Sequence, residues 1–204
     1  MADSRFHGVE VSTTIGGRFL GDDRFRPFWA AAERTGAIVF VHPSQQGLGL
    51  SALGRFRLWN LVGNPTETAF TVADMVMSGL LEQHPALKVV LAHAGGSILS
   101  MRGRMLHGWA VAPECKAALT ASPDDSLRRL YYDTVTHDTV MLQRLLEFVG
   151  PDHVLLGSDY PFDMATADPV GFVREAGLAP ANMEAVLNGN ALGLLGMAER
   201  PTGG

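Results

Sequence analysis

The sequence has only one cysteine, Cys115, and fewer basic than acidic residues. A single cysteine cannot form an internal disulfide, which fits a reducing compartment such as the cytoplasm. The 16 Lys and Arg residues stand against 21 Asp and Glu residues and give a net charge of -5. A nucleic-acid-binding protein would need clustered basic residues, so this balance argues against a nucleic-acid partner.

Long hydrophobic runs are also missing. The longest apolar stretches, such as residues 37–41, are far shorter than the roughly 20 residues that span a bilayer. The first residues, MADSRFHG, have neither the basic start nor the apolar core of a secretory signal. We therefore expect a soluble, cytoplasmic protein with no membrane partner.

The chain does contain a regular alternation of short apolar runs and helical patterns. We expect five strands, at residues 8–13, 37–42, 87–93, 130–135 and 154–159. Helical composition marks residues 25–34, 66–83, 97–111, 138–149, 168–176 and 181–195. This alternation indicates parallel βαβ units in one α/β domain covering residues 1–204. Five strands fit either a flavodoxin-like open sheet or five-eighths of a (β/α)8 TIM barrel, and periodicity alone does not separate them.

Polar side chains stand where these strands end. His42-Pro43 follows the second strand, His93 the third and Asp159 the fifth, while His137-Asp138 follows the fourth. The carboxyl ends of parallel strands meet on one face, where ligands bind in such folds. Imidazoles and carboxylates gathered there suit a divalent metal such as zinc.

Each of these positions also has a structural interpretation. His42 before Pro43 could simply end a strand, and Asp159 could cap a turn. We interpret His137-Asp138 as structural, with Asp138 capping the next helix. The coincidence of several polar strand ends nevertheless favours a shared site.

Several motifs resemble amidohydrolase-related proteins of the aminocarboxymuconate-semialdehyde decarboxylase type. They are AAAER at 30–34, FVHP at 40–43, LKVVLAHAGG at 87–96, DHVLLGSDYPF at 152–162, GNA at 189–191 and LLG at 194–196. The resemblance implies a (β/α)8 barrel with one metal ion, usually zinc. It implies that His42 is a metal ligand, that His93 is catalytic, and that Asp159 is both a ligand and a proton shuttle.

The sequence departs from this family in two respects. The family's His-x-His ligand pair on the first strand has no counterpart here. Residues 8–13 match the family's fourth strand, so strands 4 to 8 are expected and metal binding should be weakened. At the substrate site the resemblance points to Arg104, Arg57 and Trp59, while Ala112 replaces an arginine.

The resemblance thus predicts a metal-dependent decarboxylase, or a hydrolase, acting on a small carboxylated aromatic or muconate-like compound. The alternative is a catalytically silent fragment or an assembly partner. We expect a homo-oligomer, or a complementing N-terminal chain, because five strands would leave open edges. We also expect the inward faces of the strands to be poorly covered, at Val39, Val41, Val89, Leu91 and Leu155 or at their neighbours.

Overall fold

A computed structural model describes residues 6–44 and 48–197 of the chain. It contains one five-stranded parallel sheet with the order β1-β4-β5-β6-β7. The strands are β1 (Gly8–Ser12), β4 (Ile38–His42), β5 (Lys88–Leu91), β6 (Tyr131–Asp133) and β7 (Val154–Leu155). All five expected strands are present, although β7 ends well before residue 159.

The strand order distinguishes the two folds that the sequence left open. Neighbouring strands in the sheet follow one another along the chain, apart from the separate hairpin of β2 (Thr14–Ile15) and β3 (Arg18–Phe19). A flavodoxin-like sheet would place its second strand at the edge, in the order 2-1-3-4-5. Sequential parallel order is that of a (β/α)8 barrel, so the chain forms a partial barrel.

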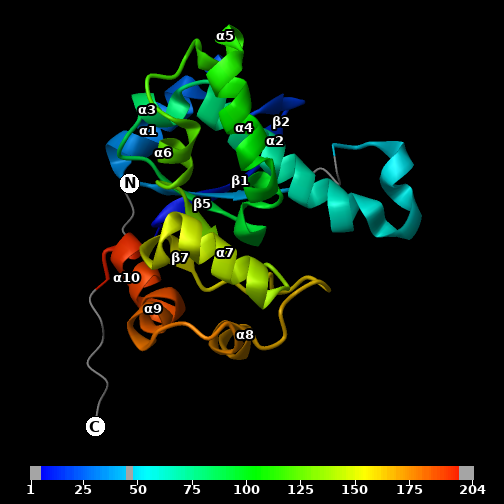
Figure 1. Ribbon diagram of the computed structural model, residues 1–204, viewed down its shortest axis with the longest axis vertical. Coiled ribbons are helices and arrows are strands. Elements are labelled where there is room, and N and C mark those ends of the chain that lie inside the picture. Colours follow the sequence, from blue (N-terminus) through cyan, green and yellow to red (C-terminus); the bar gives the residue numbers. More distant parts are fainter. Residues whose placement is uncertain (1–5, 45–47, 198–204) are drawn as a thin grey trace.

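Helices connect the strands, and in the view of Figure 1 they lie above and below the strands. They are α1 (Arg26–Thr35), α2 (Asn64–Met77), α3 (Leu80–Gln83), α4 (Ile98–Val111), α5 (Pro113–Lys116), α6 (Pro123–Leu127), α7 (Thr139–Val149), α8 (Pro169–Glu175), α9 (Pro180–Glu184) and α10 (Asn190–Leu195). Within the described ranges, none of them has the length and apolar character needed to cross a membrane.

Local sequence explains where several helices begin and end. Gly36, with φ 65°, ends α1, and the Asp138 side chain accepts hydrogen bonds from Val140 and Met141 at the start of α7. The helix expected over residues 66–83 is divided because Gly79 adopts a left-handed conformation with φ 69°. Glycine takes this conformation readily, so the chain turns between α2 and α3.

The expectation of a poorly covered inner face was wrong for most of the residues named. Val39, Val41, Val89 and Leu91 are at most 1% exposed and belong to the main core, together with residues of the surrounding helices. Because side chains alternate across a strand, their neighbours take the other face. Leu155 does lie on that concave face, with Phe40 and Val90, and is itself 9% exposed beside Leu194 of α10.

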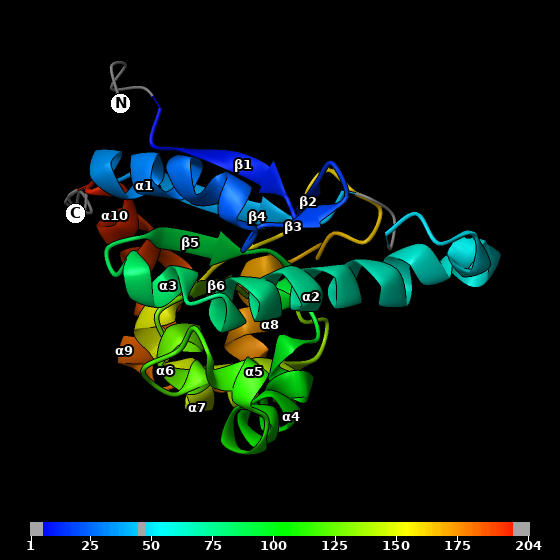
Figure 2. The same cartoon turned by 90° about the horizontal axis from the view of Figure 1, so that it is seen from above.

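A helical arm projects beyond the carboxyl ends of the strands (Figure 2). The arm (residues 51–63) consists of the 3-10 turns η2 (Ser51–Arg57) and the π-helical turn η3 (Trp59–Gly63), which continues directly into α2. Glu67 of α2 is fully buried and accepts hydrogen bonds from the Thr13 hydroxyl and the Leu48 amide. These bonds hold the start of α2 against the chain that follows β1.

Candidate metal centre

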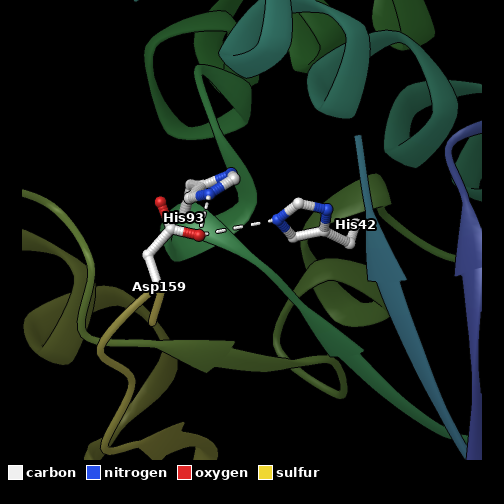
Figure 3. Close-up of side chains that lie close together, drawn as sticks. All are labelled: His42, His93 and Asp159. Atoms are coloured by element: carbon white, nitrogen blue, oxygen red, sulfur yellow. Dashed lines mark ion pairs between the residues drawn. The ribbon is translucent and has the colours of Figure 1, made fainter. Parts of the chain in front are cut away.

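Three side chains at the carboxyl ends of the strands point toward one another (Figure 3). His42 is the last residue of β4, and His93 opens the 3-10 turn η4 (His93–Gly95) just after β5. Asp159 lies in the loop after β7. Their side chains are 16%, 18% and 11% exposed, so each is largely buried but still reaches solvent.

The carboxylate of Asp159 stands between the two imidazoles. Its Oδ1 lies 3.6 Å from Nε2 of His42 and 3.4 Å from Nε2 of His93. The two rings are 5.0 Å apart between centroids, and the ring of Phe162 stacks on His42 at 5.8 Å. The three expected side chains therefore converge, as the shared strand-end positions predicted.

Two of the three residues have unusual backbone conformations. His93 and Asp159 have φ values of 53° and 60°, and Ala94 after His93 has 53°. Residues other than glycine rarely adopt positive φ, and such conformations occur mainly at functional sites where neighbouring contacts hold them in place. The turn after each strand thus directs its side chain toward the shared centre.

Asp133, at the end of β6, supplies such contacts for His93. The carboxylate accepts hydrogen bonds from the backbone N–H groups of His93 at 3.0 Å, Ala94 at 2.8 Å and Val135 at 3.0 Å. Burial raises the pKa of Asp133, while the nearby His93 and the three N–H donors act in the opposite direction. The role of Asp133 was not predicted from the sequence, although a carboxylate inside the run LYYDTV was a usable signal.

A cavity of about 370 Å³ opens beside His93 and Asp159. Its walls come from the arm and α2, from α4, and from the loops after β6 and β7. The lining residues besides His93 and Asp159 are Asn60, Leu61, Asn64, Pro65, Ala94, Gly96, Leu99, Ser100, Val135, Thr136, His137, Met141, Leu145 and Met164. This volume and mostly apolar lining are typical of a small-molecule pocket.

A second cavity, of about 340 Å³, lies on the concave face of the sheet. His42, Asp133 and Asp159 line it together with Phe40 and Val90. Asp159 thus borders both cavities, while His93 faces the first and His42 the second.

The three residues expected to bind substrate lie outside the lining of the first cavity. Arg57 forms a two-armed ion pair with Asp163, at 2.6 and 2.9 Å, and its guanidinium stands 5.7 Å from the Trp59 ring. Arg104 lies exposed on α4. Among the described lining residues there is no arginine or lysine. A substrate role for Arg57, Trp59 and Arg104 stays a prediction.

His137 and Asn64 are two polar residues of this cavity for which no chemical role was predicted from the sequence. His137 has φ 55° and lines the cavity, while the Asp138 beside it caps α7 as expected. The Oδ1 atom of Asn64 is buried and has no hydrogen-bond partner among the described residues. The positive φ of His137 was not detectable from sequence, because it depends on the turn that joins β6 to α7.

The donor set suits a divalent metal ion. One ligand atom each from His42, His93 and Asp159 all lie within 4.8 Å of one another. Two imidazole nitrogens and a carboxylate oxygen are ligands that zinc and related metals accept in proteins. The residues present therefore fit a metal ion at this position.

Parallel βα units with these side chains at the strand ends define a barrel-type α/β protein with a candidate metal centre. The profile of the amidohydrolase family matches residues 1–197, so the chain belongs to the amidohydrolase family. The 2-amino-3-carboxymuconate-6-semialdehyde decarboxylase of Dictyostelium discoideum is 31% identical over 194 residues, covering 93% of this chain and 53% of that protein. The chain spans about half the length of the curated relatives it matches.

Solved structures of decarboxylases have the same fold. The 5-carboxyvanillate decarboxylase of Sphingomonas paucimobilis superimposes with a TM-score of 0.83 at 26% identity, covering 95% of this chain and 59% of that one. A dihydroxybenzoic acid decarboxylase of Polaromonas sp. JS666, solved with bound manganese and 2-nitroresorcinol, superimposes with a TM-score of 0.72 at 22% identity. The match covers 87% of this chain and 55% of that one. These matches agree with a partial TIM barrel.

Proposed function

We propose that this chain carries part of the metal site and the substrate cavity of a metal-dependent decarboxylase for a small carboxylated aromatic or muconate-like compound. The observation that carries the proposal is the convergence of His42, His93 and Asp159 beside an apolar cavity. The relatives support it, because they are named as decarboxylases of compounds of these two kinds.

His42 and Asp159 would hold the metal ion, with His93 beside it. A bound divalent ion would supply positive charge that stabilises the electrons left on the substrate when carbon dioxide departs. Manganese, bound in the Polaromonas enzyme, and zinc are the metals to test. Two or three ligands from this chain make up a weak site, so we keep the expectation of weakened zinc binding.

The remaining chemistry belongs to the side chains. The bond between the carboxyl carbon and the carbon that bears it breaks, carbon dioxide leaves, and the electron pair stays on the carbon that bore the carboxyl group. His93, in its protonated form, donates the Nε2 proton to that carbon. Oδ1 of Asp159 lies 3.4 Å from this nitrogen. The Asp159 carboxylate therefore stabilises the positive charge of the His93 imidazole before the proton is transferred.

The cavity suits a compound the size of a single ring. Leu61, Leu99 and Met141 provide apolar contact, and Asn64 and His137 offer hydrogen bonds to ring substituents. Burying an apolar ring in such a space is favourable, while the two polar side chains fix its orientation. Both residues are proposed as substrate contacts alongside Arg57, Trp59 and Arg104.

Carbon dioxide release is the direct test. The chain is loaded with manganese or zinc and given 5-carboxyvanillate, a dihydroxybenzoate or 2-amino-3-carboxymuconate 6-semialdehyde, each labelled with ¹³C in the carboxyl group. The assay is repeated with the N-terminal part of the Dictyostelium relative added as a separate chain. Labelled carbon dioxide should appear with the wild-type chain and not with Asp159→Asn, which removes the carboxylate but keeps the shape.

Two outcomes would contradict the proposal. Opening of lactone substrates without carbon dioxide release would favour the related hydrolase activity. A chain that shows no turnover in either preparation would favour the silent fragment or assembly partner, to which the missing His-x-His pair points. A complementing chain, a homo-oligomer and a cytoplasmic location all stay predictions.

A further inference from the structure

We infer that Asp133 is a positioning residue, which sets the direction of the His93 imidazole by fixing the backbone beneath it. The inference rests on the proposed role of His93 and goes beyond it by naming the group that orients the ring. Asp133 itself does not need to touch substrate or metal for this role.

The first observation is the set of groups that Asp133 binds. One oxygen, Oδ2, accepts the N–H of His93, and the other, Oδ1, accepts those of Ala94 and Val135. Two of these three donors belong to consecutive residues with φ 53°. Left-handed conformations at two residues other than glycine cost free energy and persist only where contacts enforce them. The buried carboxylate provides that enforcement.

The second observation is that only one nitrogen of the His93 ring has a polar partner among the described residues, since Nε2 lies 3.4 Å from Oδ1 of Asp159. The His93 Nδ1 atom is buried and has no hydrogen-bond partner within residues 6–44 and 48–197. A histidine that binds a metal usually gives its second nitrogen a carboxylate or carbonyl partner, which fixes the ring. Here the carboxylate of Asp133 bonds to the backbone of His93 and not to Nδ1 of its ring. The direction of the ring therefore depends on the backbone conformation as well as on Asp159.

The third observation is that the fold leaves room for this carboxylate. A Cβ atom added to Gly157 would lie 2.8 Å from Cβ and 3.1 Å from Cγ of Asp133. Any larger residue at this position would displace Asp133, and would also crowd Val135, whose Cγ2 would lie 3.1 Å from the added atom. The Gly157 N–H in turn donates to the Thr134 hydroxyl at 3.1 Å, which ties the chain leading to Asp159 to β6. Asp133 is thus enclosed between the two strand ends that carry His93 and Asp159.

Asp133→Asn separates positioning from general stability. The amide oxygen can occupy the place of Oδ1 and keep the bonds from Ala94 and Val135. The amide nitrogen then occupies the place of Oδ2 and faces the His93 N–H with donors of its own. The matched control is Asp74→Asn, because Asp74 accepts the Gly21 N–H at 2.8 Å in a partly buried position away from the metal centre.

The test is nuclear magnetic resonance on the full chain without metal or substrate, so its result is independent of whether the chain decarboxylates anything. The contact between the His42 and His93 rings, whose centroids are 5.0 Å apart, gives the readout. We expect Asp133→Asn to abolish this ring-to-ring signal and to speed amide exchange at His93 by at least about tenfold. Amides of β5 should keep their protection, and Asp74→Asn should leave the ring contact unchanged.

An unchanged ring contact in folded Asp133→Asn would overturn the inference, and so would the same loss in Asp74→Asn. If Asp133→Asn does not fold, Gly157→Ala decides the matter, because its methyl group displaces Asp133 without removing any hydrogen-bonding group. A shifted or lost contact between His42 and His93 in Gly157→Ala would support the inference. A wild-type contact there would contradict it.

Discussion

At the scale of single residues, the centre consists of one carboxylate between two imidazoles. Nε2 of His42 and Nε2 of His93 lie 3.6 and 3.4 Å from the same oxygen of Asp159. This arrangement gives the two histidines different surroundings, since His93 faces the substrate-sized cavity and His42 faces the concave side of the sheet. The difference supports a catalytic role for His93 and a ligand role for His42.

Substitutions at the centre should separate these roles. In a preparation that releases carbon dioxide, His93→Ala should abolish turnover and leave the metal content unchanged, because the ion keeps His42 and Asp159. Asp159→Ala should lose both, because the carboxylate is shared. Elemental analysis beside the turnover assay measures the two effects. Full activity of His93→Ala would refute its catalytic role.

Sequence could predict the three converging residues because each stands at or shortly after the end of a recognisable apolar run in a familiar motif. It could not predict Asp133, whose role depends on backbone N–H groups brought to it from the neighbouring strand. Nor could it show that Arg57 is engaged by Asp163, because these residues lie 106 positions apart. Contacts between distant loops depend on the assembled fold.

At the scale of elements, the positions of the strands could be predicted from the apolar runs. The break in the long helix and the assignment of strand residues to the two faces of the sheet could not. The long helix expected over residues 66–83 divides at Gly79, because this glycine adopts a left-handed backbone conformation although the apolar pattern continues through it. The arm lacks a clear period and was not foreseen. The two faces of the strands were confused, because in β4 and β5 both faces are rich in apolar residues, and alternation gave no signal.

Gly79→Ala should destabilise the fold at this break. Alanine is strained at φ 69°, and its added methyl group would collide with the Ala118 carbonyl oxygen. We expect a loss of at least about 1 kcal/mol in the free energy of unfolding, measured with urea.

Gly103→Ala is the matched control, because Gly103 lies inside α4 with open space around it. That substitution should stabilise the chain by about 0.5–1 kcal/mol, because alanine favours helices. Equal effects of the two substitutions would show that the left-handed turn is not required.

The link between α3 and the segment before α6 should depend on pH. Burial by itself would raise the pKa of the Glu82 carboxyl group. Hydrogen bonds from the Thr120 hydroxyl and amide and from the Ala121 amide outweigh burial and hold this pKa below its ordinary value. A lowered folded pKa contributes stability above the unfolded value of about 4.3, and that stability is lost as the pH falls through the folded value.

Glu82→Gln should therefore melt at a lower temperature than the wild-type chain near neutral pH. The difference should shrink below a pH of about 4, where the wild-type carboxylate also becomes protonated. Thermal melts across this range measure it. A difference that stays constant with pH would contradict the assigned cause.

At the scale of the whole molecule, the sheet described here has two open edges, β1 and β7. A closed barrel has no edges, whereas open strands offer unpaired N–H and C=O groups to other chains. Apolar side chains on the arm add to this, with Phe56, Leu61 and Val62 exposed by 75%, 52% and 54%. The outer face of the sheet is buried under helices, so it adds no exposed apolar surface for association with other chains.

We expect the chain to self-associate, or to need a further segment, when it is studied alone. Sedimentation velocity at micromolar concentration should show dimers or larger species. Replacing the exposed Phe56 and Leu61 by serine should reduce the association that depends on the arm. Association through the open strand edges β1 and β7 should remain. A monodisperse monomer with a cooperative thermal transition would contradict this expectation.

The central claim, that one divalent ion binds where His42, His93 and Asp159 converge, is most directly tested with manganese. Small amounts of Mn²⁺ are added to the isotope-labelled chain, and the nuclear magnetic resonance signals broadened by the metal are mapped. This readout detects even weak binding, which the small number of ligands leads us to expect. The account predicts broadening centred on these three residues and its loss in Asp159→Asn. Broadening centred elsewhere, or unchanged in that variant, would contradict it.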